Sequence, residues 1–392
     1  MTGDQQLVAA AVIEPVRTQD DLKQFVAFPW SVYKGDPYWV PTFFRERMQF
    51  FDPKRNPFFE HSQVQLFMAR RDGKVVGTVA AISNGNHVKF HDEQVGFFGH
   101  FECIDDQEVA RQLLDAASEW VGAKGLKAIR GPMNMSTNDE CGLLVNGFDS
   151  APVAMMTYNP RYYERLIEAN GFSKSQDLYA WIIRTDFYQN RTENLPRKVL
   201  ESCEKLKAEG RIAIRQADLS RFEEELLRAR HVYNAAWGRN WGFVPMTDRE
   251  IEHLAHNLKK FLDEELVFFA EDDGTPVGIS VGIPDVNEPL LRSYPRAGAG
   301  LLRYAYDGVR FLWEKRKRPR LLRLLIMGVI EGYRGRGIDA CFYVDTARRA
   351  FEKGYELCEM SWILESNHMM NRIIQRMGGR LYKTYRVYDK AL

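Results

Sequence analysis

The chain has 392 residues, 45% of them hydrophobic and 27% charged, so it can bury a large core and lacks the composition of a disordered protein. Its 54 Lys and Arg residues are balanced by 53 Asp and Glu residues. The resulting formal charge of +1 provides no overall field to attract nucleic acid or an anionic membrane. At roughly 100 to 200 residues per domain, this length predicts two domains. A small-molecule enzyme fits the composition better than a nucleic-acid-binding protein does.

The first residues do not resemble a secretory signal. Asp4 stands where such a signal carries positive charge, and the apolar run that follows, residues 7–13, is short. No stretch reaches the roughly 18 uncharged apolar residues of a membrane helix. We therefore expect a cytoplasmic protein with no membrane partner. Its five cysteines form no Cys-x-x-Cys pair and are expected to be reduced and mostly buried.

The sequence contains an internal repeat at an offset of about 200 positions. The segments FMARRDGKVVGTVAAI and FFAEDDGTPVGISVGI each place an Asp-Gly turn between two apolar runs, at residues 72–73 and 273–274. Asp-Gly between apolar runs is typical of a β-hairpin. Further along, YYERLIEANGF matches MMNRIIQRMGG, a pattern typical of a short helix that ends in glycine.

Each copy continues after its hairpin with a strand, an amphipathic helix and a further strand. In the first copy the helix is predicted from near Asp105, where Glu108 supplies a capping pair, to Gly125. In the second copy apolar residues recur at helical spacing from Ala340 to Phe351, and Gly354 ends the pattern. The pattern predicts an α/β (α+β) fold in which a mixed, mostly antiparallel sheet flanked by helices occurs twice.

The repeat divides the chain into three parts. The first copy spans residues 1–189 and has a long loop at 131–160, a linker and basic helix occupy 190–209, and the second copy spans 210–392. The second copy also carries an insertion of about 25 residues that includes LLRYAYDGVRFLWEKRKRPR. The basic run at 315–320 could bind nucleic acid or lipid, but a solvated run that complements the helix C-terminus is favoured.

A glycine-rich loop joins a strand to a helix in the second copy. An apolar strand ends at Ile330, residues 334–337 read Arg-Gly-Arg-Gly, and the helix follows at once. Glycines let the backbone approach an anion closely, and the first amides of the helix point toward it. The loop predicts a phosphate or pyrophosphate site, although the same glycines can serve only to make a tight turn.

These segments resemble the GNAT acetyltransferase superfamily. Arg334 and Gly337 match the first and fourth positions of the superfamily's Arg/Gln-x-x-Gly-x-Gly/Ala loop, and Asn367 matches the Asn that begins its last short helix. The resemblance covers residues 210–392 well and 10–188 as a weaker copy. It implies a tandem GNAT protein with a degenerate first copy, where the acidic segment GFFGHFECIDDQE replaces the anion loop and no cofactor is expected.

The resemblance also implies the reaction and the cofactor. It predicts direct transfer of an acyl group, by family default acetyl from acetyl-CoA, to a small-molecule amine. A backbone amide of the fourth strand, that of Val329, would polarise the thioester carbonyl. The residues expected to hold the cofactor are Met327, Val329, Arg334, Gly335, Arg336, Gly337, Ile338 and Asn367.

A base must remove a proton from the amine before it attacks. Glu331, next to the end of the strand, is the first candidate and Glu365 is the second, although both can equally be surface acids. The superfamily often has a Tyr that protonates the leaving thiolate, but Ile374 occupies that position, so Tyr333 is the candidate acid. No metal is expected, because the pairs His87/His91 and His253/His256 have no third ligand.

The long loop of the first copy is the candidate for binding the acceptor, and a purely stabilising loop is the alternative. Asp339 in the anion loop and Ile374 depart from the family pattern and motivate an alternative function as a non-catalytic CoA-binding or CoA-sensing protein. The basic inserted helix motivates a further alternative, an interaction protein built on the same fold. The loop residues expected to contact the acceptor are Asn134, Ser136, Asn138, Glu140 and Tyr158.

Overall fold

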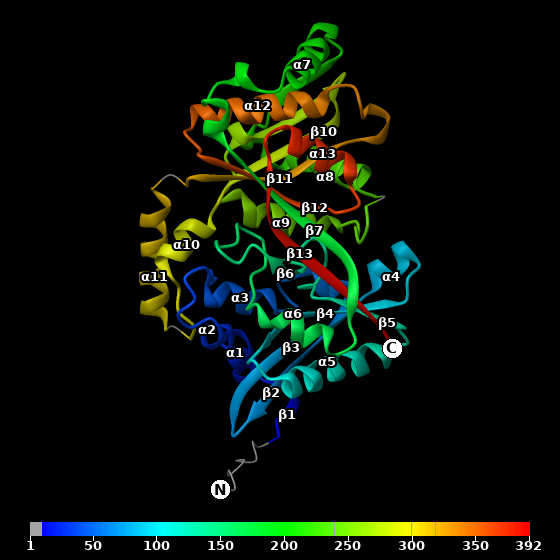
Figure 1. Cartoon of the computed structure of the whole chain (residues 1–392), viewed down its shortest axis with the longest axis vertical. Coiled ribbons are helices and arrows are strands. Elements are labelled where there is room, and N and C mark those ends of the chain that lie inside the picture. Colours follow the sequence, from blue (N-terminus) through cyan, green and yellow to red (C-terminus); the bar gives the residue numbers. More distant parts are fainter. Residues whose placement is uncertain (1–9, 239, 299, 318) are drawn as a thin grey trace, which may run out of the picture.

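The computed structural model describes residues 10–238, 240–298, 300–317 and 319–392, so part of the apolar run at 7–13 and Arg318 of the basic run lie outside the described residues. The predicted α/β fold is confirmed, because the strands form one large, mostly antiparallel sheet with helices on its faces (Figure 1). Its strand order is β1-β2-β3-β4-β5-β13-β7-β12-β11-β10-β9-β8, with β6 beside β13.

The strands are β1 (Val12–Pro15), β2 (Ser62–Arg71), β3 (Lys74–Asn84), β4 (Val95–Cys103), β5 (Ala128–Gly131), β6 (Leu143–Asn146), β7 (Ser173–Arg184), β8 (Ile212–Gln216), β9 (Val267–Asp272), β10 (Thr275–Pro284), β11 (Leu321–Val329), β12 (Leu357–Leu364) and β13 (Arg380–Ala391).

The α-helices are α1 (Gln19–Ala27), α2 (Pro29–Val32), α3 (Phe44–Phe50), α4 (Gly85–His91), α5 (Gln107–Gly122), α6 (Tyr162–Glu168), α7 (Arg197–Glu209), α8 (Phe222–Ala236), α9 (Asp248–Lys259), α10 (Asn287–Ser293), α11 (Leu301–Lys315), α12 (Ile338–Glu352) and α13 (His368–Arg376). Short 3-10 helices are η1 (Pro57–Glu60), η2 (Thr185–Tyr188), η3 (Thr192–Asn194), η4 (Leu219–Arg221), η5 (Glu264–Leu266) and η6 (Glu331–Tyr333).

Both predicted hairpins are present. Strands β2 and β3 pair across Asp72 and Gly73, and β9 and β10 pair across Asp273 and Gly274. All four turn residues have positive φ, between 48° and 75°, as a two-residue turn that matches the twist of the strands requires.

The two halves share their last strands. Strand β7, which closes the first half, pairs with β12 of the second half, whereas β13, at the end of the chain, pairs with β5 and β7. Figure 1 shows these two long strands running side by side through the middle of the molecule. The halves are therefore joined by backbone hydrogen bonds in one continuous sheet.

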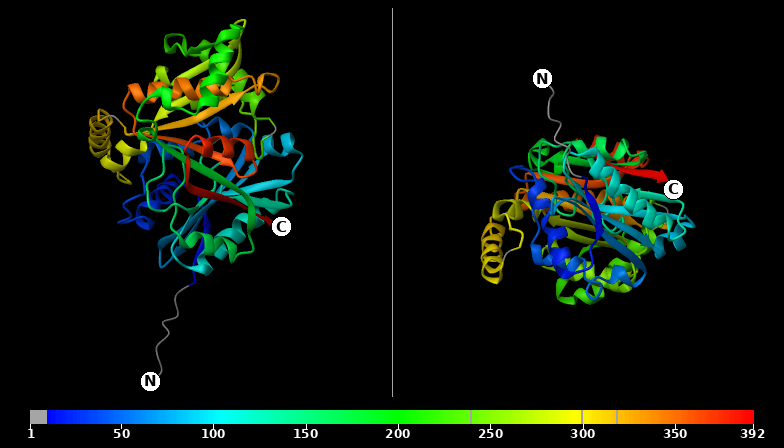
Figure 2. Two further views of the ribbon diagram at one scale, coloured as in Figure 1. Left: turned by 45° about the horizontal axis from the view of Figure 1, so that its top comes forward. Right: turned by 90° about the horizontal axis from the view of Figure 1, so that it is seen from below.

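Helices α12 and α7 pack together in the second half, and α8 packs against β10 and β11. In the first half α5 packs on β2, β3 and β4, and Asp106 rather than Asp105 caps its N-terminus. Helices α10 and α11, formed by the predicted insertion, lie at the margin of the molecule in both Figure 1 and Figure 2. None of the helices among the described residues combines the length and apolar character needed to cross a membrane.

The expectation of fully reduced thiols is wrong for one pair. Cys203 of α7 and Cys341 of α12 form a disulfide, whereas Cys103, Cys141 and Cys358 are free. The two bonded cysteines are separated by 138 positions, and only the packing of α7 along α12 brings them together.

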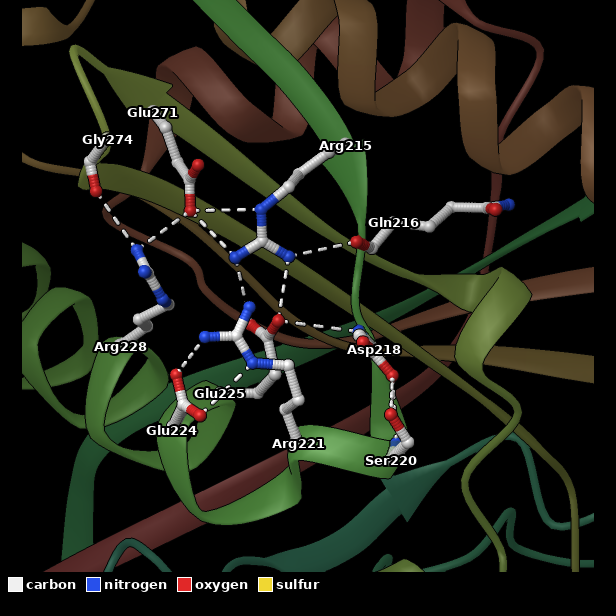
Figure 3. A network of polar contacts seen from close by, with 10 residues as sticks. All are labelled: Arg215, Gln216, Asp218, Ser220, Arg221, Glu224, Glu225, Arg228, Glu271 and Gly274. Atoms are coloured by element: carbon white, nitrogen blue, oxygen red, sulfur yellow. Dashed lines mark hydrogen bonds and ion pairs between the residues drawn. The ribbon is translucent and has the colours of Figure 1, made fainter.

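A network of charged side chains holds α8 against the outer strands of the second half (Figure 3). Arg215 of β8 donates to Glu271 of β9 at 2.7 Å and to Glu225 of α8 at 2.8 Å. Arg228, one turn along α8, donates to Glu271 at 3.0 Å. Tyr233 lies in α8 and Trp237 directly follows it, and both side chains line the candidate site. By holding α8 in place, the network therefore also positions these two aromatic residues.

Candidate active site

Strands β11 and β12 separate partway along their length. They pair in parallel only at residues 321–324 and 357–360. Val281 of β10 faces Ile326 and Gly282 faces Leu324, so Leu325 is an extra residue in β11, a β-bulge. A bulge bends its strand, and from Leu325 onward the β11 side chains change from buried to half-buried. The bulge therefore opens a cleft between the two strands.

This cleft has a volume of about 280 Å³ and draws its walls from both halves of the chain. Trp237 lies against the backbone of β11, where a Cβ at Gly328 would come within 2.3 Å of the indole ring. Met327 and Asn367, two residues predicted to hold the cofactor, line the cleft. Further lining residues are Thr137, Asn138, Asp139, Met155, Tyr233, Asn240, Trp241, Tyr343, Ser361 and Trp362.

The predicted anion loop connects β11 to α12. Gly335 and Gly337 have φ of 73° and 92°, which glycine adopts without strain. Helix α12 begins at Ile338 without a side-chain cap, and Arg336 is exposed beside it. Arg334 instead donates to the carbonyl oxygens of Val329 at 3.0 Å and Ala236 at 2.6 Å. The predicted loop therefore combines a helix start that has no side-chain cap with an exposed cation, Arg336.

The equivalent position in the first half is filled by the chain's own carboxylate. Asp106 accepts hydrogen bonds from the backbone amides of Glu108 and Val109 at 3.0 and 3.2 Å. Arg71 donates to the same carboxylate at 2.8 Å. The first amides of α5 are thus already paired, in contrast to those of α12.

The 131–160 loop divides between two cavities. Asn138 lies in the cleft of the second half, where its Nδ2 donates to the carbonyl oxygen of Val244 at 3.1 Å. Asn134, Glu140 and Tyr158 instead line a cavity of about 160 Å³ in the first half. Ser136 is buried between them and donates to Asp139 Oδ2 at 3.0 Å. The five predicted acceptor contacts therefore do not form one surface.

Side chains from the second half hold the later part of this loop in place. The buried carboxylate of Asp285 accepts a hydrogen bond from the amide of Ala154 at 2.8 Å, and Asn287 donates to the carbonyl of Pro152 at 2.9 Å. Arg323 donates to the carbonyl of Ala154, and Lys383 to that of Ser150 at 2.8 Å. Burial of these polar groups is compensated only while the two halves remain together.

Asp139 is a carboxylic acid of the cleft lining that the sequence did not predict. It borders the cleft, and burial raises the pKa of its carboxyl group to about 7. A carboxyl group with a pKa near the working pH is suited to accept and return a proton. Its neighbours Asn138 and Glu140 are also polar, and no sequence signal shows that Asn138 and Asp139 turn into this cleft while Glu140 lines the other cavity.

The predicted catalytic residues lie elsewhere in the described part of the chain. Glu331 is exposed after β11, and the hydroxyl of Tyr333 donates to Asp272 at 2.8 Å, which raises the pKa of Tyr333. Glu365 accepts from Lys174 at 2.7 Å and from the amide of Asp177 at 3.1 Å. Within the described residues, these three are absent from the cleft lining.

The first-half cavity contains a second buried carboxyl group. Glu102 accepts hydrogen bonds from the hydroxyls of Tyr33 and Tyr163 at 2.9 and 2.7 Å, and burial raises its pKa to about 7. Both phenols are committed to this carboxyl group, and Tyr33 stacks on Trp39 at a centroid distance of 4.9 Å.

No cluster of three or more metal-ligating side chains occurs in the ranges that the structure describes.

Two known proteins are similar in sequence to almost the whole chain. The chain is 37% identical over 384 residues to the bacterial ceramide synthase of Caulobacter vibrioides, covering 96% of this chain and 97% of the relative. It is 34% identical over 380 residues to protein YghO of Escherichia coli, covering 95% and 94%. No protein-family model matches.

Among solved structures, a tandem GNAT protein from the clavulanic acid biosynthesis pathway superposes with a TM-score of 0.57 at 10% identity, covering 97% of this chain and 98% of that chain. A GCN5-related glucosamine N-acetyltransferase region of a fungal β-N-acetylglucosaminidase superposes with a TM-score of 0.55 at 16% identity, covering 99% of this chain and 39% of that one. These likenesses confirm the predicted tandem GNAT fold.

Proposed function

Because the chain belongs to the family of the Caulobacter bacterial ceramide synthase and Escherichia coli YghO, we propose that it transfers a fatty acyl group from acyl-CoA to the amine of a long-chain amino alcohol. The product is an amide, as in a ceramide. The observation that carries the proposal is an apolar pocket that adjoins the β11/β12 cleft, because a long hydrocarbon chain needs such a space.

This apolar pocket has a volume of about 110 Å³ and lies between helices α8 and α9 and the sheet. It shares Tyr233, Leu254 and Ile326 with the cleft, so the two spaces are neighbours. Its lining is mostly aliphatic and includes Ala229 and Leu258. We assign the acyl chain to this pocket, which favours a longer acyl group over acetyl.

The anion loop fits the phosphates of CoA. Gly335 and Gly337 have no Cβ, α12 begins without a side-chain cap, and Arg336 adds a positive charge. Acyl-CoA supplies the activated thioester. The chain's own groups bind its phosphates on the α12 side of the cleft and leave the opposite side to the amine.

A backbone amide of β11 is positioned to stabilise negative charge. The amide of Ile330 donates to Val277 of β10 at 2.9 Å. Because successive amides of a strand point in opposite directions, the amide of Val329 points away from β10 and toward the side from which β12 has departed. It would donate to the thioester oxygen as that atom gains charge.

Asp139 is the base in this proposal. Its ionised carboxylate accepts the proton that the amine loses as nitrogen bonds to the thioester carbon and the carbon–sulfur bond breaks. The departing CoA sulfur then takes up a proton, so no other reactant is consumed. Asn138 and Asn240 border the same cleft and offer hydrogen bonds to the hydroxyl groups of the acceptor.

The reaction is tested with the purified full chain, palmitoyl-CoA and sphinganine. Release of free CoA and formation of the amide, measured by mass spectrometry, are expected together. Acetyl-CoA and ethanolamine are expected to be poorer partners. CoA binding without amide formation in any pairing would contradict the proposal and favour the CoA-sensing alternative.

The assignment of the apolar pocket is tested by filling it. Ala229→Phe is expected to lower kcat/KM for palmitoyl-CoA by about tenfold or more while sparing acetyl-CoA, because one large side chain occupies the space of several methylene groups. Ala208→Phe, on the exposed side of α7, is the matched control. If the effect of Ala229→Phe on kcat/KM instead depends on the chain length of the amine, the pocket binds the tail of the amine and not the acyl chain.

A further inference from the structure

A surface helix of a globular protein normally turns its polar side to solvent and its apolar side to the core. Helix α11 does the opposite. Its large apolar residues face solvent: Leu302 is 91% exposed, Leu301 72% and Val309 68%. Among the described residues, 13 large hydrophobic side chains are exposed, and six of them belong to this one helix. The other three are Tyr306, Leu312 and Trp313.

The acidic residues of α11 lie on its buried side. Asp307 is 2% exposed and Glu314 6%. Asp307 pairs with Arg303 at 3.0 Å, and Glu314 with Lys317 at 3.0 Å. The solvent side of α11 therefore presents apolar groups without carboxylates.

The buried side is well anchored, so the exposed side is not a sign of a loose helix. Phe311 packs edge-on against Phe43 and Phe261, with centroid distances of 5.5 and 6.5 Å. Lys315 donates to the carbonyl of Lys260 at 2.7 Å, and Arg310 to that of Arg292 at 2.8 Å. These contacts hold α11 at the margin of the molecule (Figure 2), with its large apolar residues exposed.

Basic residues lie along α11 and directly after its C-terminus. The segment 301–320 contains seven Lys and Arg residues and two acidic residues, and both acids are buried. Arg310, Arg316, Lys317 and Arg320 are exposed, whereas Arg318 lies outside the described residues. A helix with apolar residues on one side and basic residues at its borders has the character of an interfacial membrane helix.

We propose that α11 docks the protein on the surface of a bilayer containing anionic phospholipid, with its apolar face among the acyl chains and its basic residues at the headgroups. A second copy of the chain is a poorer occupant, because two α11 helices in contact would bring their basic borders together. From the sequence, the basic run at 315–320 was expected to be only solvated, because the sequence does not show that the apolar side of the preceding helix faces solvent. This inference does not depend on the proposed reaction.

The test is flotation of the full chain with phosphatidylcholine vesicles, with and without phosphatidylglycerol. We expect binding that requires phosphatidylglycerol and weakens with salt. The double variant Leu302→Glu/Leu312→Glu is expected to bind at least about tenfold more weakly, because two apolar anchors are lost. Both side chains face solvent, so circular dichroism and Tm are expected to match those of the wild type.

Leu227→Glu, at a 55% exposed position on α8, is the matched control and is expected to float like the wild type. Absence of binding to anionic vesicles overturns the proposal, and so does binding that the double variant leaves unchanged. Light scattering without vesicles completes the test: a wild-type dimer that the double variant converts to monomer would assign the face to a second copy.

Discussion

The hydroxyl of Tyr233 donates a hydrogen bond of 2.7 Å to Oδ1 of Asn138. Tyr233 comes from α8 of the second half and Asn138 from the long loop of the first half. The bond lies at the cleft, next to Asp139. The site is therefore assembled across the two halves, and its geometry depends on how they pack.

Removing this hydroxyl is expected to disturb the site more than the fold. Tyr233→Phe should cost about 1 kcal/mol of stability, the usual contribution of one hydrogen bond, and lower kcat by about tenfold because Asn138, the neighbour of Asp139, loses the partner that fixes it. Steady-state kinetics and thermal unfolding measure the two effects. Tyr179→Phe, on β7, is the control, and equal kinetic losses in both variants would refute the role of this bond.

Asp139→Asn is expected to lower kcat by about 10²–10⁴-fold, the range for loss of a general base. In the wild type, kcat/KM should rise with pH through about 7, because the carboxylate acts only when ionised and burial raises its pKa to about 7. This limb should disappear from the residual activity of the variant. A pH–rate profile shared by both proteins would exclude Asp139 as the base.

The same pKa predicts the pH dependence of stability. The folded state binds the proton of Asp139 more tightly than the unfolded chain does, whose carboxyl pKa is about 3.9. Stability contributed by the protonated group is therefore present at low pH and is lost as pH rises toward about 7. The stability of Asp139→Asn relative to the wild type should increase from about pH 5 to about pH 8. Denaturant unfolding at both pH values measures it, and a constant difference would contradict the assigned pKa.

Two glycines of the anion loop provide a matched pair. Both have positive φ, but a Cβ at Gly337 would lie 2.8 Å from the carbonyl oxygen of Ser202, whereas a Cβ at Gly335 meets nothing within 4 Å. Gly335→Ala should cost about 1 kcal/mol through backbone strain alone. Gly337→Ala should cost more and weaken CoA binding by about tenfold or more, because α7 or the loop must shift. Calorimetry with CoA separates the two, and equal affinities would show that the approach of α7 has no influence.

Asp285 orders the loop over the cleft. Asp285→Ala leaves the buried amide of Ala154 without its acceptor, which is expected to cost about 1–3 kcal/mol and to speed hydrogen exchange at residues 150–158. Asp285→Asn retains an acceptor oxygen and should be closer to the wild type. Unchanged exchange in Asp285→Ala would show that Arg323 and Lys383 are sufficient to hold this segment.

The repeated unit and its local elements follow from the amino-acid sequence alone. Asp-Gly turns such as Asp273-Gly274 specify hairpins. The apolar run before Gly335 and Gly337 and the helical spacing of apolar residues after them specify a strand, a loop and a helix. Both patterns are local, because turn chemistry and residue periodicity act over a few positions. The resemblance to GNAT proteins rested on the same local motifs, and the fold confirms it.

Tertiary packing sets which strands the halves share and how the 131–160 loop divides between two cavities. It also brought Cys203 to Cys341 and turned Asp139 into the cleft, while Glu331 and Glu365 stayed outside its lining. Neighbouring residues of an irregular loop have no fixed periodicity, so their directions depend on distant partners such as Asp285 and Arg323. The apolar residues of α11 are likewise present in the sequence, but which side of the helix faces solvent depends on its packing. In the folded chain the side that carries Asp307 and Glu314 is buried and the apolar side is exposed.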